Sequence, residues 1–132
     1  MVTRLTAGVE STTTKQRGDA GEDRALAHLL AQGLTLVRRN YRVARGPGQR
    51  GGEIDLILRE RNGTLVFVEV RARAGAGFGG AAASVGFAKQ RSLVFAAQHF
   101  LSRLRSVPPC RFDVIALEGE HIEWLRAAFD AG

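Results

Sequence analysis

Hydrophobic and polar positions recur along this chain with two different periods, which divide it into helices and strands. Apolar residues return every three or four positions over about residues 14–32 and 84–104, the spacing that one face of an α-helix requires. Short apolar or alternating runs, typical of β-strands, cover about residues 34–43, 53–60, 64–73, 111–117 and 121–125. The predicted order is therefore helix, three strands, helix and two strands.

Turn and capping residues mark the ends of these segments. Thr13 or Thr14 can cap the first helix, and Gly33 suits a left-handed stop after it. Glycine-rich stretches at 45–52 and 74–82 indicate loops, and residues 61–63 indicate a tight turn. No internal repeat is visible. We predict a flexible tail over residues 1–13 and one α/β domain over 14–132, with a mixed central sheet flanked by helices.

Composition excludes several classes of protein. The chain has 132 residues, of which 45% are hydrophobic and 24% charged, as in ordinary globular domains. No apolar run approaches the roughly 20 residues that span a bilayer, and the first residues do not form a signal peptide. Cys110 is the single cysteine, which excludes an internal disulfide and a cysteine-based zinc site. We expect a cytoplasmic protein without a membrane partner.

The charge balance favours a polyanionic partner. Lys and Arg number 19 against 13 Asp and Glu, for a net charge of +6. A basic surface attracts nucleic acid because each neutralised phosphate releases condensed counterions, although solubility or arginine-rich codon usage would give the same balance. Six basic residues flank the two glycine-rich loops and are candidates for phosphate contacts, with solvated surface as an equal alternative: Arg42, Arg45, Arg50, Arg73, Lys89 and Arg91.

The two strands between residues 53 and 73 predict their own register. If residue 60 pairs with residue 64, a three-residue turn remains, with Gly63 in the left-handed position. One face of the hairpin then becomes wholly apolar, whereas a slip by one residue would mix apolar and charged side chains on both faces. The apolar pairs in this register are Ile54 with Val70, Leu56 with Val68, and Leu58 with Val66.

The other face of the same hairpin carries an unfavourable pair of acids. Asp55 lies opposite Glu69 in this register, with Cβ atoms about 5 Å apart. Like charges at that separation destabilise a sheet unless a proton or a cation lies between them. Two carboxylates beside a backbone carbonyl suit Mg²⁺. Glu53 and Arg71 form the next pair along this face, as an acid with a base.

A third acid lies on the inward face of the first helix. Glu22 shares that face with Ala25 and Leu29, and Gly18 and Gly21 would allow the helix to approach the sheet closely. We therefore expect Glu22 to join the two strand carboxylates. The alternative is that Glu22 only complements the positive N-terminal end of the helix.

Four segments together resemble the YraN family, which comprises small bacterial proteins predicted to be endonucleases and distantly similar to archaeal Holliday junction resolvases. These segments are GDAGE (18–22), GEIDLI (52–57), VFVEVRAR (66–73) and RFDVI (111–115). The resemblance runs from about residue 16 to residue 129. It implies a restriction-endonuclease-like fold and the PD-(D/E)xK nuclease site. Asp55 and Glu69 would bind Mg²⁺ or Mn²⁺, the Val70 carbonyl would add a ligand, and Glu22 would match the helix-one acid of resolvase-like members. The relatives also suggest a homodimer.

Arg71 departs from the motif, which has lysine two residues after the glutamate. Arginine can stabilise negative charge but cannot act as a base, because its pKa stays above about 12. A bound divalent cation could still activate the water. Lys89, near the start of the second helix, is the only other lysine in the globular part that could substitute for the motif lysine, although a solvated helix residue is its slightly favoured interpretation. Arg71 itself could be no more than the ion-pair partner of Glu53.

Three functions follow from these residues. The first is a Mg²⁺- or Mn²⁺-dependent phosphodiesterase acting on DNA, including branched or recombination intermediates, in which Arg71 stabilises the phosphate charge. The second is a non-catalytic nucleic-acid-binding module on a nuclease fold. The third is a protein-interaction domain with an incidental basic surface. The segment GAGFGG (75–80) matches a dinucleotide fingerprint, but no acid follows it before Asp113, for which we predict a structural pairing with Arg111.

Overall fold

The computed structural model describes residues 14–72 and 85–131. The predicted tail (1–13), the glycine-rich loop at 74–82 and Arg73 lie outside the described residues. The elements are α1 (Thr14–Ala31), β1 (Thr35–Val43), β2 (Gly52–Arg59), β3 (Leu65–Ala72), α2 (Phe87–Leu101), β4 (Cys110–Glu118) and β5 (His121–Phe129). Their predicted order is confirmed, and the last strand runs four residues beyond its predicted end at residue 125.

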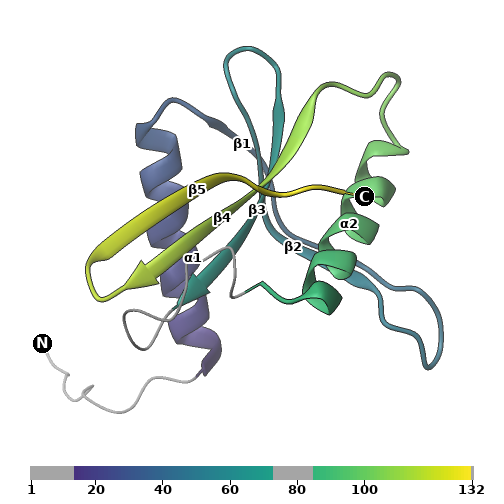
Figure 1. The fold of residues 1–132 in the computed structure, drawn as a ribbon, viewed down its shortest axis with the longest axis horizontal. Coiled ribbons are helices and arrows are strands. Elements are labelled where there is room, and N and C mark those ends of the chain that lie inside the picture. The colour runs from purple at the N-terminus through teal and green to yellow at the C-terminus, as the bar shows by residue number, and fades with distance from the viewer. Residues whose placement is uncertain (1–13, 73–84, 132) are drawn as a thin grey trace, which may run out of the picture.

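The strands form one mixed sheet in the order β1-β2-β3-β4-β5 (Figure 1). Only β3 and β4 pair in parallel, and the other neighbours are antiparallel. Parallel neighbours need a crossover connection, and α2 lies in the connection between β3 and β4. The predicted α/β domain with a mixed sheet is therefore confirmed.

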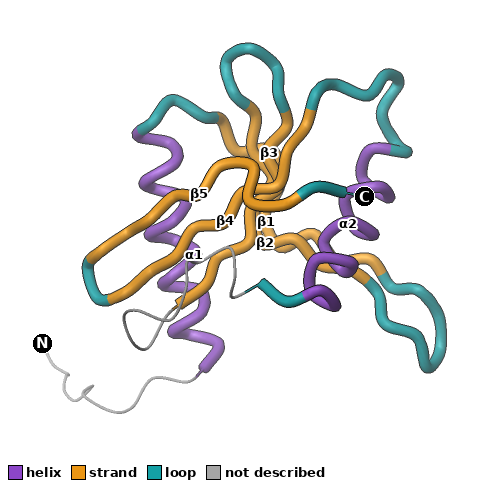
Figure 2. Tube along the Cα trace, viewed as in Figure 1, coloured by secondary structure: helices purple, strands orange, loops and turns teal. Residues whose placement is uncertain are grey.

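Helices cover both faces of the sheet, with α1 on one side and α2 on the other (Figures 1 and 2). Ala25 and Leu29 of α1 pack on one buried cluster, and Leu93, Ala96 and Ala97 of α2 pack on the other. Neither described helix is long and apolar enough to cross a membrane.

Glycines bring each helix close to the sheet. A Cβ atom at Gly21 of α1 would lie 3.1 Å from Cδ1 of Leu117 on β4, whereas one at Gly18 would meet nothing within 4 Å. The predicted close approach of α1 therefore holds at Gly21 and is wrong at Gly18. On the other face, a Cβ at Gly52 would lie 2.5 Å from the carbonyl oxygen of Ser92. Glycine at position 52 thus allows α2 to rest directly on the first residue of β2.

The predicted hairpin register is confirmed near the turn and wrong beyond it. Leu56 pairs with Val68 and Leu58 with Val66, and Gly63 has a φ of 95°. The pairing of β2 with β3 ends at Leu56, so the predicted pair of Ile54 and Val70 does not form.

The face of β2 reverses at Asp55. Ile54 belongs to the buried cluster under α2, whereas Leu56 belongs to the cluster under α1, although the two residues are two positions apart on one strand. The neighbouring strand explains the reversal: Asn40 has a φ of 54°, between the pairs Tyr41–Ile54 and Arg39–Leu56. A left-handed residue inside a strand interrupts the alternation of its side chains. Asp55 lies at this interruption and takes no part in the regular pairing of β2 with β3.

Candidate functional site

A cavity of about 190 Å³ opens between α1 and the ends of β2 and β3 where these strands stop pairing. Its acidic lining comes from three elements: Glu22 from α1, Asp55 from β2 and Glu69 from β3. The rest of the lining is formed by Gly18, Gly21, Val70, Ala72 and Leu117. The three acids that the sequence singled out therefore line one cavity.

Asp55 is held by the backbone of β3. Its Oδ2 accepts a 2.8 Å hydrogen bond from the N–H of Val70, in place of the ladder contact that a regular strand would make. Burial, followed by the charge of Glu69, raises the pKa of Asp55 to about 7 from 3.8, and a hydrogen bond between the two carboxyl groups adds to the increase. The two side chains thus interact directly, although their backbones are not paired in the ladder as predicted.

Glu69 lies between two cations. Its side chain is 5% exposed, and its Oε2 accepts a 3.3 Å hydrogen bond from Nη1 of Arg71. Nζ of Lys89, near the start of α2, lies 3.7 Å from Oε1. That distance is too long for a hydrogen bond, and Oε1 is buried with no hydrogen-bond partner among the described residues.

Two sequence interpretations of these cations are wrong. Arg71 does not pair with Glu53, because Glu53 accepts a 3.2 Å bond from Arg42 on β1 instead. The reversal of β2 at Asp55 accounts for this change, since Glu53 is in register with Arg42. Lys89 is not simply a solvated helix residue, because its half-buried side chain lies beside Glu69.

Glu22 lies within electrostatic reach of Asp55. Burial and the charge of Asp55 raise the pKa of Glu22, and a 3.4 Å bond from Nε of Arg39 opposes that increase. Arg39 also forms a 2.6 Å ion pair with Asp23 and therefore ties β1 to α1. Sequence reasoning missed Arg39, because nothing local indicates that β1 faces the middle of α1. Across residues 14–72 and 85–131, no three Asp, Glu, His or Cys side chains lie close enough to hold one metal ion. Asp55 and Glu69, whose carboxyl groups interact directly, are the two side chains that could share a metal ion.

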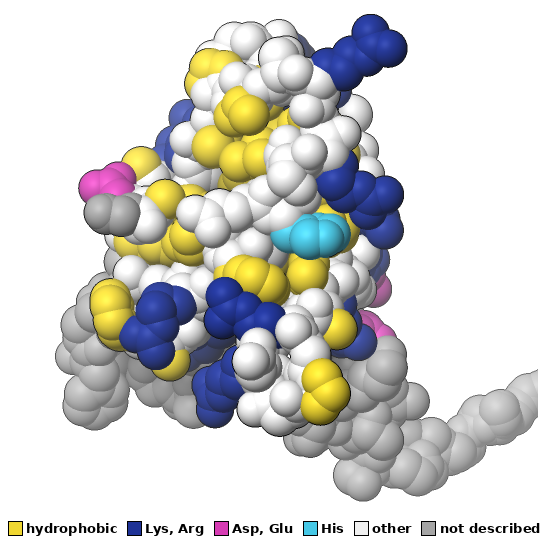
Figure 3. Space-filling view, turned by 90° about the vertical axis from the view of Figure 1, so that its right-hand side faces the viewer, with side chains coloured by type: hydrophobic (Ala, Val, Ile, Leu, Met, Phe, Trp, Pro, Cys, Tyr) yellow, Lys and Arg dark blue, Asp and Glu magenta, His cyan; other side chains and the backbone are white. Residues whose placement is uncertain are grey.

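A basic groove lies between α2 and the loop that joins β1 to β2. Figure 2 shows this loop beside α2. The groove consists of two adjoining cavities of about 640 Å³ each, which share Arg50, Gly51, Ala88 and Ser92. Five of the six predicted phosphate-contact residues line it, namely Arg42, Arg45, Arg50, Lys89 and Arg91. On the face that carries α2, basic side chains are interspersed with hydrophobic ones and acidic side chains are sparse (Figure 3). Lys89 connects the groove to Glu69.

Asp113 has a structural role, as predicted. Its side chain is fully buried and accepts bonds of 2.9 and 3.1 Å from Nε of Arg111. The indole N–H of Trp124 and the backbone N–H of Ala127 each donate a further bond of 2.9 Å. Asp113 is thereby surrounded by donors from β4 and β5 and does not line the acidic cavity.

The fold and the site define an α/β protein with a mixed sheet, a pair of interacting carboxyl groups of which one is buried and one partly buried, and a basic groove. Residues 21–117 match the model of the family described as "Uncharacterised protein family UPF0102", and the chain belongs to that family, in agreement with the YraN-like motifs. A UPF0102 protein of Methylibium petroleiphilum is 70% identical over 119 residues, which cover 90% of this chain and 98% of the relative. A UPF0102 protein of an Acidovorax species is 60% identical over 128 residues, covering 97% and 95%.

Proposed function

We propose that this protein is a divalent-cation-dependent phosphodiesterase that cleaves DNA at the cavity formed by Glu22, Asp55 and Glu69. The observation that carries the proposal is Oε1 of Glu69, which is buried without a hydrogen-bond partner among the described residues and shares its cavity with Asp55. Burying a carboxylate oxygen without a partner is costly, and so is placing two carboxyl groups together. A cation between the two groups removes both costs.

The donor set fits Mg²⁺ or Mn²⁺. Both are hard cations that prefer oxygen, and Mg²⁺ is commonly held by one or two carboxylates, with water and substrate phosphate completing its coordination. Asp55 and Glu69 would hold the ion, and the Val70 carbonyl would be a further ligand. When bound, such a cation acidifies water and neutralises charge on the scissile phosphate.

The other side chains have defined tasks in the hydrolysis. Water attacks the phosphorus, the bond to the leaving oxygen breaks, and that oxygen takes up a proton. Arg71 and Lys89 flank Glu69 and would stabilise the negative charge that develops on the phosphate oxygens. Glu22, held by Arg39, would accept a hydrogen bond from water on the α1 side of the cavity.

The resemblance of two sequence motifs supports the same assignment. The motifs GEIDLI and VFVEV, which resemble those of PD-(D/E)xK nucleases, provide Asp55 and Glu69. Arg71 stands where that motif has lysine, and this substitution argued for a non-catalytic module. Lys89 weakens that argument, because it brings a lysine ammonium group to the same glutamate from another element.

A cleavage assay tests the proposal. The full chain is incubated with linear, supercoiled and four-way-junction DNA in Mg²⁺, Mn²⁺ or EDTA, beside Asp55→Asn and the exposed control Glu123→Gln. We expect metal-dependent cleavage that Asp55→Asn reduces by at least about a hundredfold and the control leaves unchanged. Calorimetric titration with Mn²⁺ should show binding that Asp55→Asn weakens. Equal cleavage by Asp55→Asn, or DNA binding without cleavage in either metal, would overturn the proposal, and the second result would favour the non-catalytic module.

A further inference from the structure

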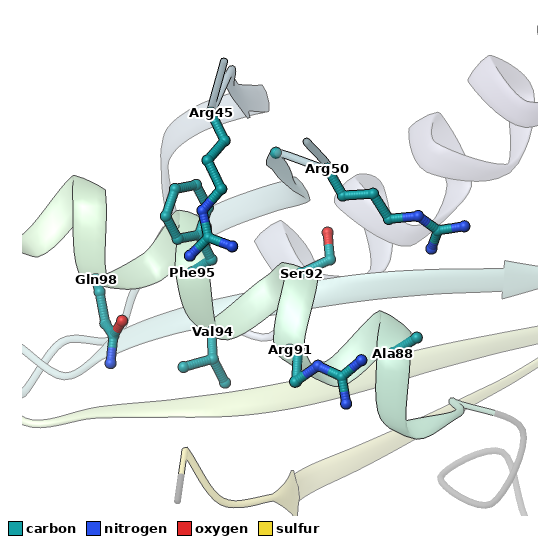
Figure 4. Close-up of a pocket in the computed structure, with 9 residues that line it drawn as sticks. Arg45, Arg50, Ala88, Arg91, Ser92, Val94, Phe95 and Gln98 are labelled. Carbon is teal, nitrogen blue, oxygen red and sulfur yellow. The ribbon is translucent and has the colours of Figure 1, made fainter. Parts of the chain in front are cut away.

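The outer side of α2 alternates aromatic and cationic side chains. Phe87, Arg91 and Phe95 follow one another at intervals of four residues, so they extend along roughly 12 Å of the helix. The guanidinium carbon of Arg91 lies 4.6 Å from the ring centroid of Phe87. Arg45, from the loop between β1 and β2, lies 4.1 Å from the centroid of Phe95 (Figure 4). Two guanidinium–phenyl stacks therefore lie on the same side of one helix.

These stacks are accessible from solvent. Phe87 is 72% exposed, which is unusual for a large apolar side chain, and Arg45 and Arg91 are exposed as well. The Arg45–Phe95 stack lines the basic groove together with Arg50, and Figure 4 shows Arg45 over the ring of Phe95, with Arg50 extending to one side from the same loop as Arg45. A guanidinium group that rests on a ring has its second planar face available. Aromatic rings and guanidinium planes are the surfaces on which unpaired bases stack.

The charge of the groove is only partly compensated: Arg42 pairs with Glu53 and Lys89 lies beside Glu69. Within residues 14–72 and 85–131, no carboxylate forms an ion pair with Arg45, Arg50 or Arg91. These guanidinium groups are thus available to phosphate oxygens, which arginine binds through its fork of N–H donors. Phosphate contacts alone would suit a duplex as well as a single strand, so the aromatic rings decide between them.

We propose that this groove binds an unpaired nucleic-acid strand. Its bases stack on the Arg45–Phe95 and Arg91–Phe87 pairs, and its phosphates contact Arg50. A duplex keeps its bases inside the double helix and would not use either stack. An acidic protein surface would use only the positive charges and would not require the aromatic rings. The path that we infer for the bound strand rests on the proposed function. Lys89 lines the groove and contacts Glu69, so a strand that runs along α2 leads to the acidic cavity. The preferred substrates are then nucleic acids with a single-stranded segment beside the scissile bond.

Binding is measured by fluorescence anisotropy in EDTA, with a labelled oligothymidine and a duplex of equal length. The background is Asp55→Asn throughout, so that cleavage plays no part. We expect the single strand to bind at least about tenfold more tightly than the duplex, and Arg45→Ala and Phe87→Ala each to weaken it by about tenfold. Phe87→Trp should retain the affinity, because it keeps a ring for stacking.

Arg126→Ala is the matched control. Arg126 lies over the ring of Trp124 at 4.0 Å on β5, so its removal deletes an equivalent stack and one charge away from the groove. The affinity of the Arg126→Ala variant for the single strand should stay within about twofold of that of the Asp55→Asn protein. Equal affinity for duplex and single strand, or an equal loss in Arg126→Ala and Arg45→Ala, would overturn the inference. Single-strand binding by a protein without nuclease activity would overturn only the proposed function, whereas cleavage without strand selectivity would overturn only this inference.

Discussion

Nζ of Lys89 lies 3.7 Å from Oε1 of Glu69, across the junction between α2 and β3. Arg71 bonds the other oxygen of the same carboxylate at 3.3 Å. Glu69 therefore sits between a lysine and an arginine that come from different elements. The residue two positions after the glutamate supplies one of these cations, and the helix that crosses from β3 to β4 supplies the other.

This arrangement predicts that Lys89→Ala lowers metal-dependent cleavage by about a hundredfold, the usual cost of removing one group that stabilises transition-state charge. The melting temperature should change little, because the Lys89 side chain is 32% exposed. The measurement is the single-turnover cleavage rate, beside thermal unfolding. Arg103→Ala, which removes an exposed cation just beyond the other end of α2, is the control and should leave the rate unchanged. A normal rate in Lys89→Ala would restrict the lysine to a structural role.

The two cations should also substitute for one another. If Lys89 supplies what the motif lysine supplies elsewhere, Arg71→Lys in the intact protein should change the cleavage rate by less than about tenfold. In the Lys89→Ala background the same change should restore most of the lost rate, because a lysine again lies beside Glu69. The four proteins form a double-mutant cycle measured by one rate assay. Additive effects of the two substitutions would show that the residues act independently.

Stability should depend on pH through Asp55. Its pKa is about 7 in the folded protein, against 3.8 for the ordinary group. Between these values the folded state binds a proton that the unfolded chain lacks, so this stabilisation is complete below about pH 4 and is lost as the pH rises through about 7. Asp55→Asn should therefore raise the free energy of unfolding at alkaline pH, without metal, by on the order of 2 kcal/mol and the melting temperature by about 5 °C.

Thermal unfolding of both proteins across this pH range, in EDTA and in millimolar Mg²⁺, checks this expectation. The difference between Asp55→Asn and the wild type should shrink toward acidic pH, where Asp55 is protonated. Mg²⁺ should also reduce the difference at alkaline pH by stabilising the wild type alone. A difference that stays constant with pH would mean that Asp55 is not buried beside a second carboxylate.

The predictable part of this structure is the part that depends on local patterns. Element order and the pairing of Leu56 with Val68 follow from hydrophobic period and turn chemistry, both of which act over a few residues. The prediction failed at Ile54 because the cause lies on a neighbouring strand, where Asn40 adopts a left-handed conformation. Asparagine tolerates that conformation better than most residues, so its presence in the middle of β1 was the available signal.

The acids of the site were predictable, whereas the contacts that its cations make were predictable only in part. Asp55 and Glu69 belong to one hairpin, whose turn brings them near each other even though the predicted pairing stops at Leu56. The partners of Glu69 and Glu22 depend on how helices cross the sheet. Lys89 reaches Glu69 through the packing of α2 on β2, and Arg39 reaches Glu22 because β1 lies under α1. No spacing within a single element encodes either contact.

Asp113 should be essential for folding and dispensable for chemistry. Its buried carboxylate accepts bonds from Arg111, Trp124 and the backbone of Ala127. Asp113→Ala leaves these donors buried without an acceptor and should cost about 3–5 kcal/mol of unfolding free energy. Denaturant titration followed by the fluorescence of Trp124 measures the loss, with the exposed Asp130→Asn as control. Asp113→Asn, which keeps an acceptor, should lose less and cleave at the normal rate wherever it is folded. A cleavage defect in folded Asp113→Asn would assign this residue to the site.

Replacing each of three glycines with alanine should change the free energy of unfolding by a different amount. At Gly18 the new methyl group meets nothing within 4 Å, so Gly18→Ala should stabilise α1 by about 0.5–1 kcal/mol. At Gly21 it meets the tip of Leu117 at 3.1 Å, and rotation of that side chain should keep the change within about 1 kcal/mol. At Gly52 it would lie 2.5 Å from the carbonyl oxygen of Ser92, which cannot move without α2.

Gly52→Ala should therefore cost about 3 kcal/mol or more and should displace α2 together with Lys89. The cleavage rate of the folded fraction should fall more in Gly52→Ala than in Gly18→Ala or Gly21→Ala, which add a methyl group to the cavity lining without displacing α2. Chemical denaturation and single-turnover cleavage, measured on the same three proteins, separate the two effects. A normal cleavage rate in Gly52→Ala, despite its lost stability, would contradict this prediction. It would show that the packing of α2 on β2 does not position Lys89 for chemistry.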